Sequence, residues 1–351
     1  MPASPTRRLA AAAFACAALS ACAGARQPAD QALVREPGQR RYGPPVPAAV
    51  LAGPLAPYAV LSENSYHGAW KHKPAPAAAL PAPVALELPP PDPGAYARAC
   101  APGQSGLLPL GGWRPWPDFP SQALRRQAVD LGLYVEVWER AEPDPTIAVV
   151  FKGMQPGSLR DWRTNLNWLT RFVPGFRDQY TLTSREVGLE FVEALARRAG
   201  QPGQPGPAAW RIVTTGHSLG GGLAQHFAYA LPAASAGGVA VPRVSHAYAF
   251  DPSPVTGWSA IRDKANRARN AQALHVDRVF EHGEVLAYVR LLLGYLMPPS
   301  RTTPAVRQVR FNFFDTPDII ESHSMRQLAC RLVQAASPAV GPAAGPRPPR
   351  P

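Results

Sequence analysis

Residues 210–224, WRIVTTGHSLGGGLA, decide the fold that we expect for this chain. The stretch begins as a buried β-strand, passes through a sharp turn and continues as a helix of small residues. Ser218 stands at the centre of a G-x-S-x-G pattern, in which Gly216 and Gly220 leave room for a strained turn. Such a turn holds the central hydroxyl clear of the sheet. We therefore predict that Ser218 is a nucleophile; the alternative is a glycine-rich turn whose serine is incidental.

Strand-like and helix-like stretches alternate on both sides of this turn. The predicted strands are residues 133–139, 146–151, 243–250, 273–280 and 306–314, and the predicted helices are residues 184–199, 285–297 and 324–336. Thr183 and Glu186 form a capping-box pattern before the first helix. The second helix is apolar on nearly every side, which fits either a core helix or a lid. The alternation predicts an α/β fold, with a mostly parallel sheet, helices on both faces and active residues at the carboxyl ends of strands.

A serine nucleophile needs a histidine base, and the histidine needs an orienting carboxylate. In this type of fold the chain order is serine, acid, histidine. Five histidines follow Ser218. His226 falls on the helix after the turn, and His246 and His275 fall inside predicted strands. His282 lies close to the loop that carries a candidate acid, and His323 lies in the last loop. His323 is the one placed in a loop after the final strand, so we predict that it is the base.

Two carboxylates compete for the role of the acid. Asp251 ends one predicted strand and Glu284 follows the next, and either can lie near His323. Either can equally be a turn-capping or surface carboxylate. The residues alone leave this choice open.

Three stretches resemble successive motifs of the class 3 (fungal-type) lipases of the α/β-hydrolase superfamily. They are FKGM at 151–154, DWRTNL at 161–166 and GHSLGG at 216–221. The resemblance implies that the backbone N–H groups of Met154 and Leu219 form the oxyanion hole. It also matches Glu284 to the family's aspartate, which favours Glu284 over Asp251 as the acid. The chain departs from the family at Lys152, at Met154 and at Asn165, where the family has arginine, a hydroxyl residue and aspartate.

The first 99 residues have a different composition. Residues 1–21 carry Arg7 and Arg8 and then an alanine-rich apolar run, which is typical of a secretory signal peptide. The sequence Leu-Ser-Ala-Cys at 19–22 resembles a bacterial lipobox, which implies lipidation of Cys22; the alternative is an ordinary cleavage site. Residues 22–99 contain many of the chain's 43 prolines and predict a tether with partial order, in which residues 58–70 can dock on the domain. Residues 100–336 are the predicted catalytic domain, and residues 337–351 a disordered proline-rich tail.

Two cysteines remain outside the signal and the lipobox, Cys100 and Cys330. In an oxidising compartment this pair can form a disulfide that closes the two ends of the domain. The alternative is two unpaired buried thiols.

These observations predict an exported serine esterase or lipase, anchored by lipid at the cell envelope and facing the periplasm or the surface. Ala23 after the lipidated cysteine suggests the outer membrane.

The expected partners are a lipid or small ester substrate and the membrane. The net charge of +12 is spread along the chain, so we expect no nucleic acid as a partner. No metal cluster or nucleotide motif suggests a cofactor, and the oligomeric state is not predicted. Trp162, Trp168 and Phe172 belong to a lid or acyl site, or to a packed cover segment. The competing functions are a non-catalytic envelope lipoprotein and an acyltransferase with the same triad.

Overall fold

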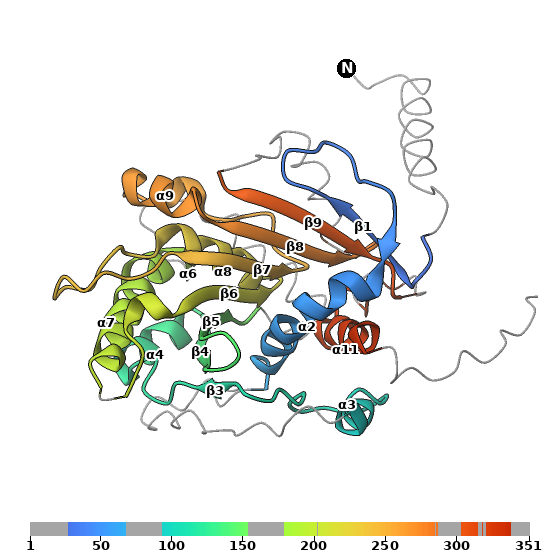
Figure 1. The fold of residues 1–351 in the computed structure, drawn as a ribbon, viewed down its shortest axis with the longest axis horizontal. Helices are drawn as coiled ribbons and strands as arrows, with labels where there is room; N and C mark the ends of the chain where they lie inside the picture. Colours follow the sequence, from blue (N-terminus) through green and yellow to red (C-terminus); the bar gives the residue numbers. More distant parts are fainter. Residues whose placement is uncertain are drawn as a thin grey trace, which may run out of the picture.

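A sheet of nine strands forms the centre of the computed structural model, which describes residues 27–67, 93–153, 179–201, 203–284, 286, 303–314, 318 and 321–337. In spatial order the strands are β2, β1, β9, β8, β7, β6, β5, β4 and β3 (Figure 1). Their bounds are β1 Gln31–Arg35, β2 Val46–Pro47, β3 Arg114–Pro115, β4 Val135–Arg140, β5 Thr146–Phe151, β6 Arg211–His217, β7 Val244–Phe250, β8 His275–Glu281 and β9 Ala305–Phe311. Strands β5 to β9 pair in parallel, and the outer strands pair antiparallel.

Helices cover both faces of this sheet. They are α2 Ala48–Asn64, α3 Pro93–Ala99, α4 Gln122–Asp130, α6 Gln179–Leu182, α7 Gly188–Ala199, α8 Leu219–Ala230, α9 Lys264–Ala271 and α11 Met325–Ala336. Helices α2 and α11 lie together on one face, and α4, α6, α7, α8 and α9 supply the core of the other (Figure 1). The predicted α/β class, a mostly parallel sheet with helices on both faces, is therefore confirmed.

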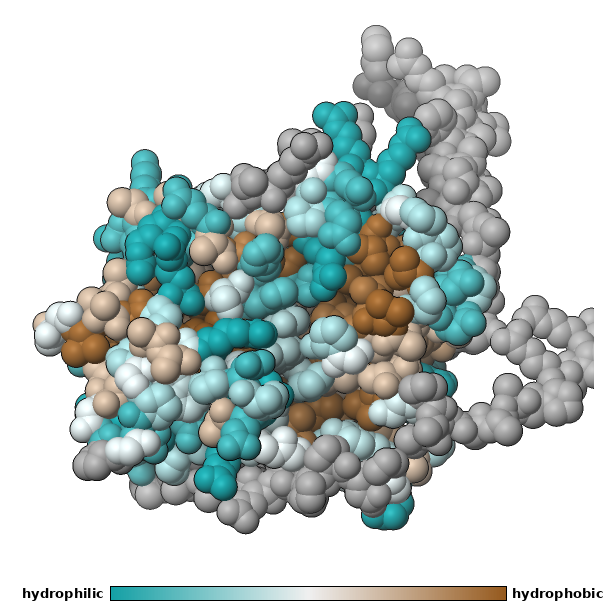
Figure 2. Space-filling model, viewed as in Figure 1, coloured by the Kyte–Doolittle hydropathy of each residue, from teal (hydrophilic) through white to brown (hydrophobic). Residues whose placement is uncertain are grey.

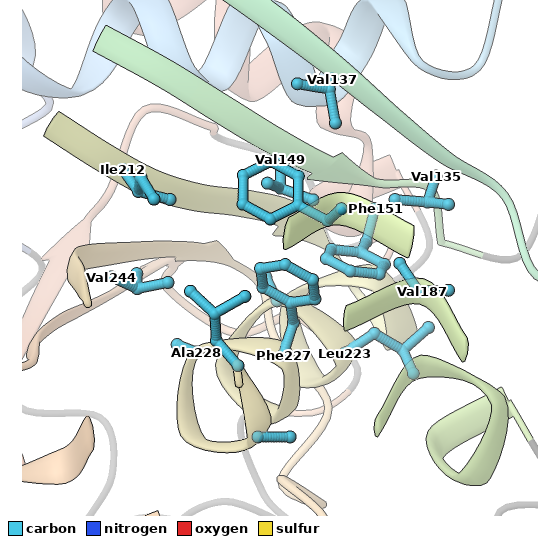
Figure 3. Packing of buried hydrophobic residues seen from close by; sticks show 14 of the residues in the cluster. Val135, Val137, Val149, Phe151, Val187, Ile212, Leu223, Phe227, Ala228 and Val244 are labelled. Carbon is cyan, nitrogen blue, oxygen red and sulfur yellow. The ribbon is translucent and has the colours of Figure 1, made fainter. Parts of the chain in front are cut away.

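Alternate residues of the buried strands face these two cores. In β5, Val149 and Phe151 point to the α8 side, and Val150 points to the α2 side. Figure 3 shows Phe151 beside Phe227 of α8, and the two ring centroids are 5.6 Å apart. A strand that is apolar on both faces is expected for a central parallel sheet. This pattern is why the continuous apolar run of β5 was recognisable in the sequence.

The carboxyl ends of the parallel strands meet at one edge of the sheet. Phe151 lies opposite Gly216, and His217 lies opposite Phe250. Glu281 ends β8 at the same edge. The segments that follow β5, β6, β7 and β8 are therefore neighbours in space, as the sequence predicted for the candidate site residues.

The N-terminal segment differs from the prediction of a tether. Strand β1 pairs with β9 of the main sheet, and α2 packs against α11 and β6. Leu55 and Leu61 of α2 are fully buried. We predicted that the domain starts at residue 100, whereas the structure folds this earlier segment into it. Pro54 and Pro57 lie inside α2, a helix that is apolar on nearly every side. We missed this helix because we took its prolines as a sign of a linker.

The helix expected at residues 184–199 also differs at its start. Thr183 is fully buried inside a π-helical turn, Thr183–Val187, which joins α6 to α7. A residue in mid-helix cannot cap the helix, so the capping-box interpretation of Thr183 and Glu186 is wrong. The strands expected around residues 133–139, 146–151, 243–250, 273–280 and 306–314 are confirmed within a few residues.

Several predictions fall on residues outside the described ranges. They concern the signal peptide, Cys22, Met154, the lid candidates at 162–172, the proline-rich tail and nearly all of the helix expected at 285–297. Within the described ranges, no helix has the length and apolar character needed to cross a membrane.

Cys100 and Cys330 form a disulfide, with their Cα atoms 5.7 Å apart. The bond ties the residue that follows α3 to the middle of α11. Of the two alternatives that the sequence left open, a disulfide or two unpaired thiols, the structure contains the disulfide.

The described surface mixes polar and apolar residues. Figure 2 shows hydrophobic areas broken up by hydrophilic ones on the face seen in Figure 1. Val50, Leu189 and Val239 are large apolar side chains with exposed surface, and they come from three separate segments. Scattered exposure of this kind is normal for a folded domain.

Candidate active site

Ser218 occupies a strained turn between β6 and α8. Its backbone has φ 57° and ψ −122°, a conformation that residues with a side chain rarely adopt. A methyl group on Gly216 would overlap the carbonyl of Gly220, and one on Gly220 would overlap the carbonyl of Phe151. The two glycines of the G-x-S-x-G pattern are therefore required by close backbone packing, as the sequence predicted.

The turn is fixed by backbone hydrogen bonds on both sides of Ser218. Its N–H donates to the Phe250 carbonyl at 2.9 Å, and its carbonyl accepts from Ser253 N–H at 2.9 Å. Leu219 is the first residue of α8, where backbone N–H groups have no partner within the helix. The N-terminus of α8 thus lies beside the serine, and its dipole favours negative charge there.

His323 and Glu284 are in direct contact. His323 Nδ1 lies 3.0 Å from Glu284 Oε2, and both side chains are buried. His323 ends a short 3₁₀ turn, Glu321–His323, immediately before α11. Leu286 N–H also donates to Glu284 Oε2, at 2.8 Å, which holds the carboxylate in place. The ring of His323 lies 4.7 Å, between centroids, from that of His217, the residue before the nucleophile candidate.

Asp251 contacts a different histidine. Its Oδ2 lies 3.9 Å from His217 Nε2, and its Oδ1 accepts from Glu281 N–H at 3.1 Å. Asp251 is fully buried and has φ 39°, so its backbone is strained as well. Of the two acid candidates, the structure places Glu284 in hydrogen-bond contact with His323 and Asp251 beside His217.

Sequence reasoning missed two members of this cluster, Tyr66 and His217. The Tyr66 hydroxyl lies 2.7 Å from His217 Nδ1. His217 is part of the G-x-S-x-G pattern, but we gave it no role. Tyr66 lies in the segment at 58–70 that was expected to dock on the domain, and its aromatic side chain was the available signal.

We expected His226, His246 and His275 to be structural; His226 and His246 make contacts within the fold, and His275 and His282 are exposed. His246 Nε2 lies 3.0 Å from Asp277 Oδ2, in the interior of the sheet. His226 Nδ1 lies 3.1 Å from the Thr256 carbonyl. Neither of these contacts involves the Ser218 turn.

Buried carboxylates near the site have raised pKa values. The pKa of Glu281 is raised to about 8: burial is the main cause, the Phe314 N–H opposes it, and the charge of Asp251 adds a smaller increase. Glu281 is therefore largely protonated at neutral pH. Burial also raises the pKa of Glu136 to about 7, against the opposing effect of the charge of Lys152.

Within the described ranges, one group of side chains has the geometry to hold a metal ion. Ligand atoms of His217, Asp251 and His323 lie within 4.8 Å of one another, and all three residues are buried. Two imidazoles and a carboxylate are a plausible ligand set for zinc. The sequence predicted no metal or cofactor, and that stays a prediction.

Comparison with known proteins gives limited information. No model of a known protein family and no curated protein matches this sequence. Among solved structures, acyl-protein thioesterase 2 of Zea mays has 14% sequence identity and a TM-score of 0.25, over 44% of this chain and 67% of that chain. This distant similarity carries no argument by itself, and the resemblance to class 3 lipases stays a prediction. The structure itself shows an α/β fold, with a largely parallel sheet, helices on both of its faces and a serine at the turn from β6 to α8.

Proposed function

We propose that this protein is a serine-dependent carboxylic ester hydrolase, similar to a lipase or phospholipase, that works through an acyl-enzyme. The observation that carries the proposal is the strained backbone of Ser218, φ 57°, at the N-terminus of α8. Strain of this kind at a hydroxyl residue is typical of functional sites. The hydrogen bond between His323 and Glu284 supports their assignment as base and acid.

In this mechanism Ser218 Oγ attacks the ester carbonyl, and His323 accepts the serine proton. Glu284 holds the imidazole through Nδ1, so that Nε2 is the atom that accepts the proton, and it stabilises the imidazolium that forms. The N–H of Leu219 donates to the oxyanion, together with the N–H of Met154 that the sequence resemblance implies. His323 then returns the proton to the leaving alcohol, and water releases the acyl group.

We also propose that the protein is exported and anchored at the cell envelope through a lipid on Cys22. The support is the signal-like stretch at 1–21 and its small residues before the cysteine. A membrane-bound hydrolase meets acylglycerols and phospholipids directly, which favours a lipid ester as substrate. Globomycin, which blocks cleavage of lipoprotein signals, should cause the precursor to accumulate in a bacterial host; an unchanged mature form would contradict lipidation.

The test of the activity uses the purified full chain and a panel of short esters, long acylglycerols and phospholipids. Ser218→Ala is expected to lower turnover by roughly 10⁴- to 10⁶-fold. A fluorophosphonate probe should label Ser218 in the folded protein. Ser245→Ala is the matched control. Ser245 lies at the start of β7, whereas Ser218 contacts the last residue of that strand, and the Ser245 hydroxyl donates to the Ile212 carbonyl at 3.1 Å.

The outcomes separate the competing functions. Hydrolysis that survives Ser218→Ala, or folded protein that the probe does not label, contradicts the proposal and favours a non-catalytic lipoprotein. A product that changes from free acid to a new ester when an alcohol is added indicates an acyltransferase with the same triad.

A further inference from the structure

Tyr66 reaches the nucleophile turn from the N-terminal segment. It lies two residues beyond the end of α2, and its hydroxyl is 2.7 Å from His217 Nδ1. A methyl group on Gly153 would overlap this hydroxyl and would lie 3.2 Å from Ser218 Cβ. The Tyr66 hydroxyl and Ser218 thus border the same small space at the end of β5.

The same hydroxyl connects two backbone segments. It contacts the imidazole of His217, the last residue of β6, and it lies against Gly153, just after the end of β5, whose N–H also interacts with it. Burial is the main factor that raises the pKa of Tyr66, so the phenol stays neutral and keeps its proton. The Lys152 ammonium lies 5.8 Å from the centre of the Tyr66 ring.

His217 is held on its other side by Asp251, at 3.9 Å. Asp251 keeps this place although its backbone is strained at φ 39° and its side chain is fully buried. A strained, buried carboxylate is costly to the fold and persists only where the surroundings require it. Asp251, His217 and Tyr66 therefore form a row, and the ring of His323, which contacts Glu284, lies 4.7 Å from that of His217. We call Asp251, His217 and Tyr66 the tyrosine row.

We propose that the tyrosine row is a positioning device for the active site, in which Tyr66 fixes the end of β5 against the nucleophile turn. This inference rests on the proposed ester hydrolysis. Met154 follows Gly153, and Leu219 follows Ser218, so the two backbone N–H groups assigned to the oxyanion hole come directly after the two segments that Tyr66 connects. In this proposal the Tyr66 hydroxyl fixes Gly153 relative to Ser218, the two residues that precede the assigned donors.

A hydroxyl with this role should affect turnover more than substrate binding. Oxyanion donors act mainly in the transition state, and a misplacement of about 1 Å can cost roughly 100-fold in rate. Tyr66→Phe keeps the ring and removes the hydroxyl. We expect it to lower kcat by about 10- to 100-fold and to change KM by less than about twofold.

The matched control is Tyr58→Phe. Tyr58 lies in α2, is buried, and its hydroxyl accepts a hydrogen bond from Arg211 at 3.1 Å. The control thus removes a bonded hydroxyl from the helix that precedes Tyr66, and this hydroxyl contacts the first residue of β6, Arg211, at the strand end opposite the nucleophile turn. It should lower the melting temperature about as much as Tyr66→Phe and leave kcat unchanged.

A second variant tests the same hydrogen bond from its other side: if Tyr66→Phe folds poorly, His217→Asn alone should lower kcat by a similar factor with little change in KM, and an unchanged kcat would overturn the inference. His217→Asn removes the other partner of the hydrogen bond, and the double variant completes a double-mutant cycle. If the two residues act as one device, the double variant loses no more turnover than the worse single variant. Independent losses that multiply would overturn the inference.

The remaining outcomes separate this inference from the proposed function. If the wild type hydrolyses esters and Tyr66→Phe matches Tyr58→Phe in kcat, the positioning role is wrong and the hydrolase proposal stands. If the wild type neither hydrolyses any ester nor reacts with the fluorophosphonate, both proposals fail.

Discussion

Replacing Glu284 with glutamine is expected to lower kcat by about 10³- to 10⁴-fold. The amide keeps the shape of the side chain and an oxygen for the Leu286 N–H, but it removes the negative charge 3.0 Å from His323 Nδ1. At an effective dielectric constant of roughly 20, two unit charges at this distance attract by about 5 kcal/mol. Because each 1.4 kcal/mol is about a factor of ten, losing this stabilisation of the imidazolium gives the expected range.

Asp251→Asn is the matched comparison, because Asp251 is also a fully buried carboxylate at the same edge of the sheet. Asp251 Oδ2 lies 3.9 Å from His217 Nε2, whereas Glu284 Oε2 lies 3.0 Å from His323 Nδ1, so we expect the replacement of Asp251 to cost no more than about tenfold. The assay is steady-state hydrolysis of the best ester from the panel, with circular dichroism to check folding. A loss of 10³-fold for Asp251→Asn beside a loss under tenfold for Glu284→Gln would refute the assignment.

Three further predictions concern stability. Because burial raises the pKa of Glu281 to about 8 from an ordinary 4.5, the folded state holds a proton that the unfolded chain releases. The contribution of Glu281 to the free energy of unfolding is therefore full below pH 4.5 and falls as the pH rises towards 8, and urea denaturation should show a less negative slope over this range in Glu281→Gln than in the wild type. Gly220→Ala, which creates a backbone clash, should lower the melting temperature sharply, whereas Gly53→Ala in α2 has open space and should stabilise the protein by about 0.5–1 kcal/mol. Breaking the disulfide with the pair Cys100→Ser and Cys330→Ser should cost about 2–5 kcal/mol in chemical denaturation, and an unchanged midpoint would show that the bond does not form in solution.

Local patterns were sufficient to predict the centre of the fold. The apolar run of β5 and the glycines around Ser218 have steric causes that act within a few residues, so the sequence predicts them directly. The pairing of His323 with Glu284 was harder, because it depends on which of two strand ends lies nearer a distant loop. The order of serine, acid and histidine narrowed that choice without deciding it.

The N-terminal segment was mispredicted for a physical reason. Composition suggested a linker, because proline usually interrupts helices. Helix α2 tolerates two prolines because tertiary packing stabilises it more than helix propensity does, with Leu55 and Leu61 fully buried. Tyr66 comes two residues after this helix and contacts His217. Because the packing of the helix places Tyr66 there, its role could not be inferred without recognising the helix.

The packing of α2 against α11 also has a consequence for the order of folding. One helix lies near the start of the chain, at Ala48–Asn64, and the other near its end, at Met325–Ala336. The neighbouring strand β1 likewise pairs with β9, the last strand in the described part of the chain. During synthesis the earlier elements are made long before their partners, and contacts between such distant segments form slowly. This half of the domain therefore cannot fold completely until α11 has left the ribosome. Until then α2 and β1 lack the elements on which they pack and pair.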